Sequence, residues 1–161
     1  MKSFHLFLTA SALTALLGAC QQAATPAPVA TVAAVTEEEA AKAFDATVAA
    51  WQSMDATRIK ALYAPDVAGF DYSAPDLVSD RITWDKNQDA FAAAKLDSVK
   101  VTNKKIQLLD GDNFVVTSHS IGTSTATPAS NFTFRCTDVY HRPGGGQFAI
   151  VNEHCSGVPK A

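Results

Sequence analysis

The sequence predicts an α+β domain in which N-terminal helices pack on one face of a strongly curved antiparallel sheet. Apolar residues recur at steps of three and four in the first half of the chain, whereas from Val99 onward they alternate with polar residues. Turn-forming Gly, Asp and Asn separate the alternating runs. Helices followed by a meander of strands are typical of this class. The roughly 125 residues after residue 36 suffice for one hydrophobic core.

The first twenty residues have the pattern of an export signal. Lys2 precedes an apolar run from Phe4 to Leu17, and small residues lead from there to Cys20. This run is shorter than the roughly 20 apolar residues that span a membrane, so we expect a cleaved signal peptide over residues 1–19. The Leu-Gly-Ala-Cys motif ending at Cys20 resembles the bacterial lipobox, in which the cysteine is lipidated. The alternative is ordinary cleavage nearby, which would release the protein.

Lipid on Cys20 would make a membrane the first partner of the mature protein, because several acyl chains on one residue hold it firmly in a bilayer. By resemblance to lipoprotein sorting patterns, Gln21 after this cysteine favours the outer membrane, with the domain facing the periplasm. Residues 20–36 are rich in Ala, Thr and Pro and are expected to form a tether. The domain itself is expected over residues 37–161.

The charge balance gives no sign of nucleic-acid binding. The chain has 13 Lys and Arg against 16 Asp and Glu, a formal net charge of −3. Removal of the leader takes away Lys2 and no acidic residue, so the mature chain is more acidic still. A basic stripe of the kind that contacts phosphates is missing from the sequence. We therefore expect no nucleic-acid partner.

The first predicted helix begins with a capping box. Thr36 offers a hydroxyl to the amide of Glu39, whose carboxylate reaches back. Three acidic residues in the first turn also suit the positive end of the helix dipole. The helix is expected to run to about Ser53 and to bury the apolar positions at steps of three and four, Ala40, Phe44, Thr47, Val48 and Trp51.

Two shorter helices and one strand should follow. Asp55 is expected to cap a helix that contains Ile59, Leu62 and Tyr63 and ends at Pro65. A short strand is expected over residues 67–72. A third helix is expected from Asp85 to Leu96, with three small or aromatic residues on its buried face, Ala90, Phe91 and Ala94.

Four alternating segments predict the meander. Residues 99–109 and 114–122 are expected to pair across the turn that begins at Asp110. A loop of small residues over 123–130 leads to a long strand, and residues 148–154 form the last. One face of the long strand is marked by its alternate residues, Phe132, Phe134, Cys136, Asp138 and Tyr140.

A disulfide is expected between the two late cysteines. With Cys20 lipidated, Cys136 and Cys155 are an even pair in a compartment that permits disulfides. A two-residue turn at Gly145-Gly146 would place these cysteines directly opposite each other, and a Gly-Gly pair suits the positive φ angles of such a turn. The bond would fix the register of the last hairpin.

The C-terminal segment resembles a known family. The run Thr137-Asp-Val-Tyr-His-Arg before the glycine turn and residues 148–159 after it carry the resemblance, and His-Cys-Ser-Gly, starting at His154, is its most specific part. These runs resemble the C-terminal hairpin of the association domain of calcium/calmodulin-dependent kinase II, in the nuclear transport factor 2-like, or SnoaL-like, superfamily. The order of elements extends the resemblance over residues 37–159. It implies a cone-shaped sheet wrapped around the first long helix, a pocket at the wide end, and a homodimer formed across the outer sheet faces.

The resemblance also implies which side chains line the pocket. The association domain carries arginines on two central strands, and those positions align with Ser120 and Asp138 here. The cationic pocket is therefore not carried over, and Arg135 lies on the strand face opposite Asp138. We expect a small hydrophobic or weakly polar ligand, contacted by aromatic residues and one serine: Trp51, Tyr63, Tyr72, Trp84, Ser120 and Tyr140. Alternatively, Tyr63, Tyr72 and Trp84 only fill the core.

Enzymes of this superfamily transfer protons with Asp, His or Tyr, which makes three residues candidate catalytic groups. Asp138 lies on a mostly apolar face, where burial would raise its pKa toward that of a general base near neutral pH; alternatively it is a carboxylate at the rim. His154 and His119 are candidate acids or bases; alternatively both are structural. Asp71 and Asp76 lie in the early loop, where related isomerases sometimes place a base, but their spacing is too common to assign a role.

Two functions follow as alternatives. The first is a membrane-tethered, dimeric binding or assembly module, which is preferred because no acid–base pair follows from the sequence and a fold alone assigns no reaction. The second is a small-molecule isomerase or dehydratase that uses Asp138 with His154 or His119.

Neither a cofactor nor a metal is expected. Gly144-Gly145-Gly146 joins two strands and lacks the following helix that phosphate binding needs. The cysteines and the nearby His141 and His154 match no zinc-binding spacing.

Overall fold

The helices come mostly before the sheet in the chain, as the sequence predicts. The computed structural model describes residues 33–72, 74–125 and 132–158; the predicted signal peptide, Cys20, most of the tether and most of the 123–130 loop lie outside this range. The elements in order are α1 (Glu37–Ser53), α2 (Ala56–Lys60), β1 (Tyr63–Phe70), α3 (Arg81–Ala93), β2 (Ser98–Leu108), β3 (Asn113–Thr123), β4 (Phe132–His141), the short 3₁₀ turn η1 (Pro143–Gly145) and β5 (Ala149–Gly157).

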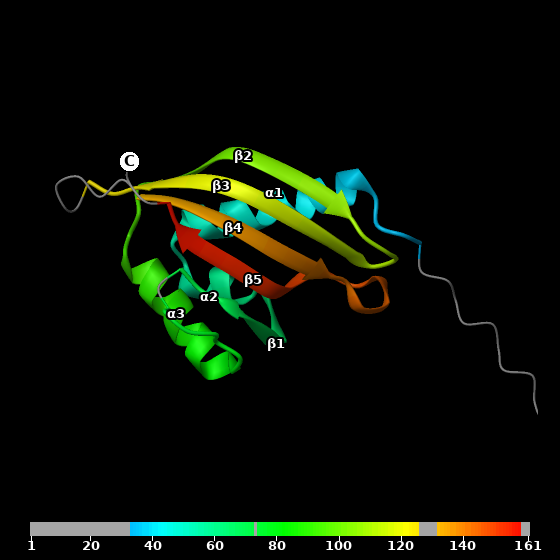
Figure 1. The fold of residues 1–161 in the computed structure, drawn as a ribbon, viewed down its shortest axis with the longest axis horizontal. Coiled ribbons are helices and arrows are strands. Elements are labelled where there is room, and N and C mark those ends of the chain that lie inside the picture. The colour runs from blue at the N-terminus through cyan, green and yellow to red at the C-terminus, as the bar shows by residue number, and fades with distance from the viewer. Residues whose placement is uncertain (1–32, 73, 126–131, 159–161) are drawn as a thin grey trace, which may run out of the picture. The chain divides into compact units, whose positions relative to one another are not determined.

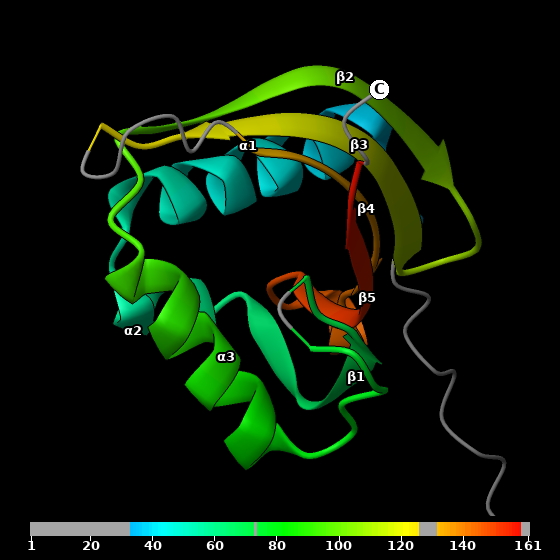
Figure 2. The same cartoon turned by 60° about the vertical axis from the view of Figure 1, so that its left-hand side comes forward.

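The five strands form one sheet in the order β1-β5-β4-β3-β2 (Figure 1). Strands β2 to β5 are antiparallel neighbours, and β1 lies parallel to β5. Figure 2 shows the sheet curving around α1, with α2 and α3 on the side away from β3. The predicted α+β class and the curved sheet around the first helix are confirmed, with the correction that β1 makes the sheet mixed.

The first helix agrees with its prediction. Thr36 and Glu39 form the complete capping box, and the helix runs from Glu37 to Ser53. The buried face contains Phe44 and Trp51, although Ala50 is buried where Val48 was expected to be. Ahead of the helix, the Val35 amide donates to the Gly111 carbonyl and the Val35 side chain is buried, so the fold already begins within the segment expected as tether.

The segment around Pro65 is a strand, where the sequence predicted the end of a helix. α2 ends at Lys60 and β1 starts at Tyr63, with an irregularity in its pairing between Tyr63 and Ala68 that accommodates the proline. The Arg81 guanidinium donates to the carbonyls of Lys60, Tyr63 and Ala64 at 2.8 to 2.9 Å. A distant arginine thus bonds the carbonyls at the point where α2 ends and β1 begins.

The third helix begins four residues before its predicted start. Asp80 caps it by accepting from the Thr83 amide. Its buried side chains are Trp84, Gln88 and Ala92, so the predicted burial of Ala90 and Ala94 is wrong.

The last hairpin has the predicted pairing but a different turn. Cys136 is directly opposite Cys155 and is disulfide-bonded to it. The connection, however, is longer than two residues: it runs from Arg142 to Phe148 and includes η1, in which Gly144 and Gly145 have positive φ. Pro143 has no amide to donate to the ladder, and a register shift after Val139 absorbs the difference in length.

Among the described residues no helix combines the length and the hydropathy that a membrane span requires.

Candidate active site in the curved sheet

A cavity of about 280 Å³ opens between α3, the end of β1 and the inner face of β4 and β5. Most of its surface is apolar, and aromatic rings from four elements contribute to it. The residues that line it are Trp51, Tyr63, Asp71, Tyr72, Gln88, Ala90, Phe91, Ala94, Phe132, Phe134, Cys136, Glu153 and Cys155. This composition is typical of small-molecule sites, in which a few polar groups interrupt an apolar wall.

Strand alternation places the polar groups. Residues 134, 136, 138 and 140 of β4 point inward and are buried, and on β5 the same holds for Glu153 and Cys155. The disulfide therefore lies in the cavity wall, and the neighbouring pair on the same face is Asp138 with Glu153. Both carboxyl groups are buried.

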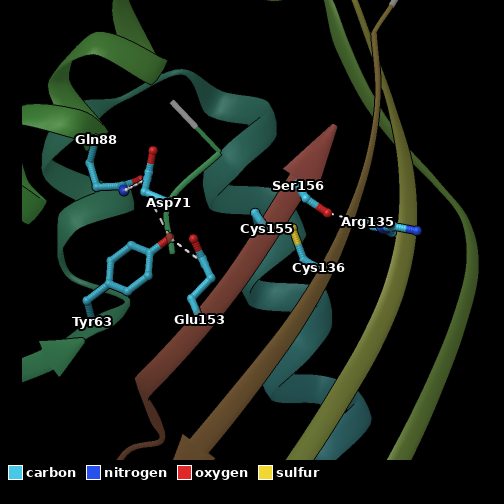
Figure 3. Close-up of a disulfide and its surroundings, with 8 residues drawn as sticks. All are labelled: Tyr63, Asp71, Gln88, Arg135, Cys136, Glu153, Cys155 and Ser156. Carbon is cyan, nitrogen blue, oxygen red and sulfur yellow. Dashed lines mark hydrogen bonds between the residues drawn. A yellow bond between two sulfur atoms is a disulfide. The ribbon is translucent and has the colours of Figure 1, made fainter. Parts of the chain in front are cut away.

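One side of the cavity carries a hydrogen-bonded cluster, shown in Figure 3. The Tyr63 hydroxyl donates to Glu153 Oε2 at 2.9 Å and lies 3.5 Å from Gln88 Oε1. Gln88 Nε2 donates to Asp71 Oδ2 at 2.9 Å. Tyr63 comes from β1, Gln88 from α3 and Glu153 from β5, so the cluster joins three elements, with Asp71 following directly after β1.

Asp138 lacks a hydrogen-bond partner for either carboxylate oxygen within the described part of the chain, although it is fully buried. The Ser118 and Ser120 hydroxyls on the inner face of β3 share this condition. Buried polar groups are normally paired with protein, water or ligand. A water molecule or a polar group of a ligand is therefore expected to bond these three side chains on the inner face of β3 and β4.

Burial changes the proton affinity of the acidic groups. It raises the pKa of Asp138 to about 8. Burial, and then the charge of Asp138, raise the pKa of Glu153 well above its usual range, while the hydrogen bond from Tyr63 acts in the opposite direction. Burial also raises the pKa of Tyr63, with the nearby Glu153 and Asp138 adding to the effect. The site therefore holds carboxyl groups that keep their protons to higher pH than carboxyl groups in water do.

The predicted histidines do not join this site. His154 is exposed on β5 between the inward-facing Glu153 and Cys155, and its ring contacts Phe70 on the outer face. His119 lies between the buried Ser118 and Ser120, and its Nδ1 is 3.1 Å from the Thr102 hydroxyl. The expectation that either histidine faces the pocket with Asp138 is therefore wrong; the buried group opposite Asp138 is Glu153.

Half of the predicted pocket residues line the cavity. Trp51, Tyr63 and Tyr72 do so. The other three, Trp84, Ser120 and Tyr140, are buried elsewhere in the core. Trp84 packs edge-on against Tyr63, while Tyr140 stacks on Phe114 and donates to the Thr47 hydroxyl.

The sequence contained a signal for Glu153 that the prediction did not use. A strand that turns Cys155 inward also turns residue 153 inward and residue 154 outward. The predicted disulfide was thus sufficient to choose Glu153 over His154. Gln88 carries no comparable signal, because its role depends on the position of α3.

Disulfide bonding also determines what the sulfur atoms can ligate. Cys136 Sγ, Cys155 Sγ and a carboxylate oxygen of Asp138 lie within 4.8 Å of one another. Since the two sulfurs are bonded to each other, neither is a thiolate that could bind a metal.

Comparison with protein families identifies the domain. A sequence profile of the SnoaL-like domain matches residues 44–150. The chain belongs to the SnoaL-like domain family. A comparison with curated protein sequences finds no match.

Solved structures similar to this SnoaL-like domain share its fold. One is a candidate calcium/calmodulin-dependent kinase II association domain from Xanthomonas campestris, at 24% identity and a TM-score of 0.66, covering 83% of this chain and 95% of that one. Another is a candidate ketosteroid isomerase from Parabacteroides distasonis, at 19% identity and a TM-score of 0.63, covering 81% of this chain and 93% of that one. A third is a candidate dehydratase of the nuclear transport factor 2-like family from Streptomyces avermitilis, at 18% identity and a TM-score of 0.61. The match covers 76% of this chain and 96% of that one. The predicted superfamily resemblance is confirmed, and at these identities the likeness concerns the fold.

Proposed function

We propose that this SnoaL-like domain binds a small, mainly apolar molecule in the cavity and holds its polar group against Tyr63 and Glu153. The observation that carries the proposal is a cavity of about 280 Å³ whose aromatic wall is interrupted on one side by hydrogen-bonded polar side chains. Such a wall binds an apolar body, and the cluster supplies the few directed contacts that orient it.

Binding of 2-naphthol, measured by isothermal titration calorimetry, tests this function. Ala90→Trp places a large side chain at the cavity lining and is expected to abolish the binding. Ala93→Trp lies on the same helix at an exposed position outside the lining and should leave it unchanged. Equal binding by both variants would contradict the proposal.

A second candidate function is proton transfer, as in an isomerase or dehydratase. The observation that favours it is the buried pair of Asp138 and Glu153 with raised pKa values beside the cavity. Two similar structures are a candidate isomerase and a candidate dehydratase. A group that exchanges its proton near neutral pH suits general acid–base catalysis.

Exchange of the α-protons of 2-methylcyclohexanone with deuterated water, measured by NMR, tests proton transfer. The wild type should accelerate the exchange, and Glu153→Gln should remove the acceleration, because the amide has the same shape but does not transfer a proton to or from the ketone. An unchanged exchange rate in Glu153→Gln would contradict this function.

We also propose that the domain works in the bacterial envelope, anchored through lipid on Cys20. Support comes from the export pattern of residues 1–20 and from the Cys136–Cys155 disulfide, which suits an oxidising compartment. Cys20→Ser should prevent the incorporation of radiolabelled palmitate and release the protein from the membrane fraction. Palmitate incorporation that persists in Cys20→Ser would contradict the anchor.

A further inference from the structure

The described residues that line the cavity combine carboxyl groups with aromatic rings and include no basic side chain. Asp71 and Glu153 lie in its wall, and Asp138 is the cross-strand neighbour of Glu153 on the same inward face. Six aromatic residues share the wall: Trp51, Tyr63, Tyr72, Phe91, Phe132 and Phe134. None of the lining residues within the described ranges is a lysine, arginine or histidine.

Ionised carboxylates on this buried face would be unfavourable without a nearby positive charge. A buried carboxylate is normally paired with a cation or held by several donors. Asp138 has neither, since both of its oxygens lack a hydrogen-bond partner among the described residues. Glu153 accepts from Tyr63, and the other charged groups that act on it are the like-charged Asp138 and Asp71. A cation in the cavity would supply the positive charge that lets Glu153 ionise there, and none of the described residues that line the cavity supplies it.

The wall determines what kind of cation fits. A metal ion such as Ca²⁺ requires six to eight oxygen ligands, whereas this wall is made mainly of rings and aliphatic groups. Aromatic faces attract organic ammonium groups through their quadrupoles, and such rings form the cages that recognise quaternary ammonium ligands. Tyr72 and Phe132 stack with their ring centroids 5.7 Å apart, and Phe134 lies 6.1 Å from Tyr72.

We infer that the ligand of this cavity is an organic cation, a small amine with an apolar body whose ammonium group lies against Glu153 and Asp71 within the aromatic wall. This inference rests on the proposed binding function and specifies the chemical class of the ligand. It also reverses the charge of the pocket relative to the arginine-lined association domain that the chain resembles.

A pair of probes of equal shape separates charge from shape. Benzyltrimethylammonium carries a quaternary nitrogen, and neopentylbenzene has carbon in its place. Titration of wild-type protein, followed by tryptophan fluorescence, should show the cation binding at least about tenfold more tightly than its neutral isostere. Glu153→Gln should weaken the binding of the cation by about tenfold and change that of neopentylbenzene by less than about threefold.

Two further variants keep the test decisive if Glu153→Gln folds poorly. Asp71→Asn removes the second carboxylate from the lining and should also weaken the cation selectively. Asp76→Asn removes an exposed carboxylate outside the lining and should have no effect. If neopentylbenzene binds as tightly as the cation, the inference fails while the proposed binding function stands. If 2-naphthol and both of these probes fail to bind, the binding function fails as well.

Discussion

Asp138 and Glu153 face each other across β4 and β5 with both carboxyl groups buried on the inner face of the sheet. Side chains directly opposite each other on antiparallel strands have Cβ atoms roughly 5 Å apart. Two negative charges at that separation repel, and burial removes the water that would screen them. Tyr63 stabilises Glu153 by a hydrogen bond, whereas Asp138 has no comparable donor in the described residues. The pair therefore retains protons that carboxyl groups in water would release.

This pair should make the domain less stable as the pH rises. The pKa of Asp138 in the folded state is raised to about 8, above that of the unfolded chain. The stabilisation from proton binding is therefore complete below about pH 4 and is lost progressively up to about pH 8, at about 1.4 kcal/mol per pH unit for one group. Urea denaturation at pH 5 and pH 8 should show a lower free energy of unfolding at pH 8.

Asp138→Asn provides the control for this pH dependence, because an amide does not ionise. The variant should lose much of the decrease between pH 5 and pH 8 and should be more stable than the wild type at pH 8. Glu39 and Asp80 have lowered pKa values and so add stability with rising pH, but their effect is complete by about pH 5. A variant that keeps the full wild-type slope would exclude Asp138 as its source.

Loss of the Cys136–Cys155 disulfide should destabilise the fold without changing its architecture. The bond joins residues 19 positions apart, for which the chain-entropy account gives about 3 kcal/mol. The double variant Cys136→Ala/Cys155→Ala should therefore unfold at lower urea concentration by about 2 to 3 kcal/mol. Wild-type protein denatured in dithiothreitol is the matched comparison. A double variant as stable as the oxidised protein would show that strand pairing alone fixes this hairpin.

The elements that could be predicted from sequence are those whose signals are local. The capping box at Thr36 locates the start of α1, and alternation assigns the inward face of β4 from Phe132 to Tyr140. The segment around Pro65 could not be predicted in this way. Its conformation depends on Arg81, which follows it by more than ten residues and donates to three of its carbonyls.

The site was predictable in part for the same reason. Asp138 was found because it lies on the apolar face of one strand, and Glu153 could have been found from the pairing of Cys155 with Cys136. Gln88 and Asp71 meet because α3 crosses the end of β1, which is a tertiary relationship without a local pattern. His154 and His119 were predicted as site residues because histidine often acts as an acid or base. Strand alternation, which turns both side chains away from the inner face, was not applied to them.

Arg142 is expected to hold the residues before α1 against the rest of the fold. Its side chain is largely buried and forms ion pairs with Glu39 at 3.1 Å and Asp112 at 3.2 Å. It also donates to the Ala33 carbonyl and lies over the Phe148 ring. Arg142→Met keeps much of the apolar stem and removes these contacts, and should cost about 2 to 3 kcal/mol, as expected for charged hydrogen bonds.

Hydrogen exchange can localise the effect of Arg142→Met. The amide of Val35, bonded to Gly111, should exchange faster in the variant because the residues before α1 are no longer held. Lys60→Ala is the control: its ion pair with Asp89 is partly exposed, and its loss should cost less than about 1 kcal/mol. Equal effects of the two substitutions would contradict a special role for Arg142.

Gly69 should be the position in β1 least tolerant of a side chain. It pairs with Glu153 on β5 and exchanges two backbone hydrogen bonds with Val78 on its other side. A Cβ atom at this position would lie 1.8 Å from the Glu153 carbonyl oxygen, so the backbone would have to move. Gly69→Ala should therefore separate β1 from β5 beside the Tyr63–Glu153 hydrogen bond and destabilise the domain by roughly 2 kcal/mol or more.

Gly146→Ala is the matched control, because the nearest heavy atom to the added Cβ is 3.3 Å away and φ is negative. It should change the free energy of unfolding by less than about 1 kcal/mol. Urea denaturation of both variants measures the difference. A Gly69→Ala protein as stable as the control would show that β1 and β5 can move apart without loss of free energy of unfolding.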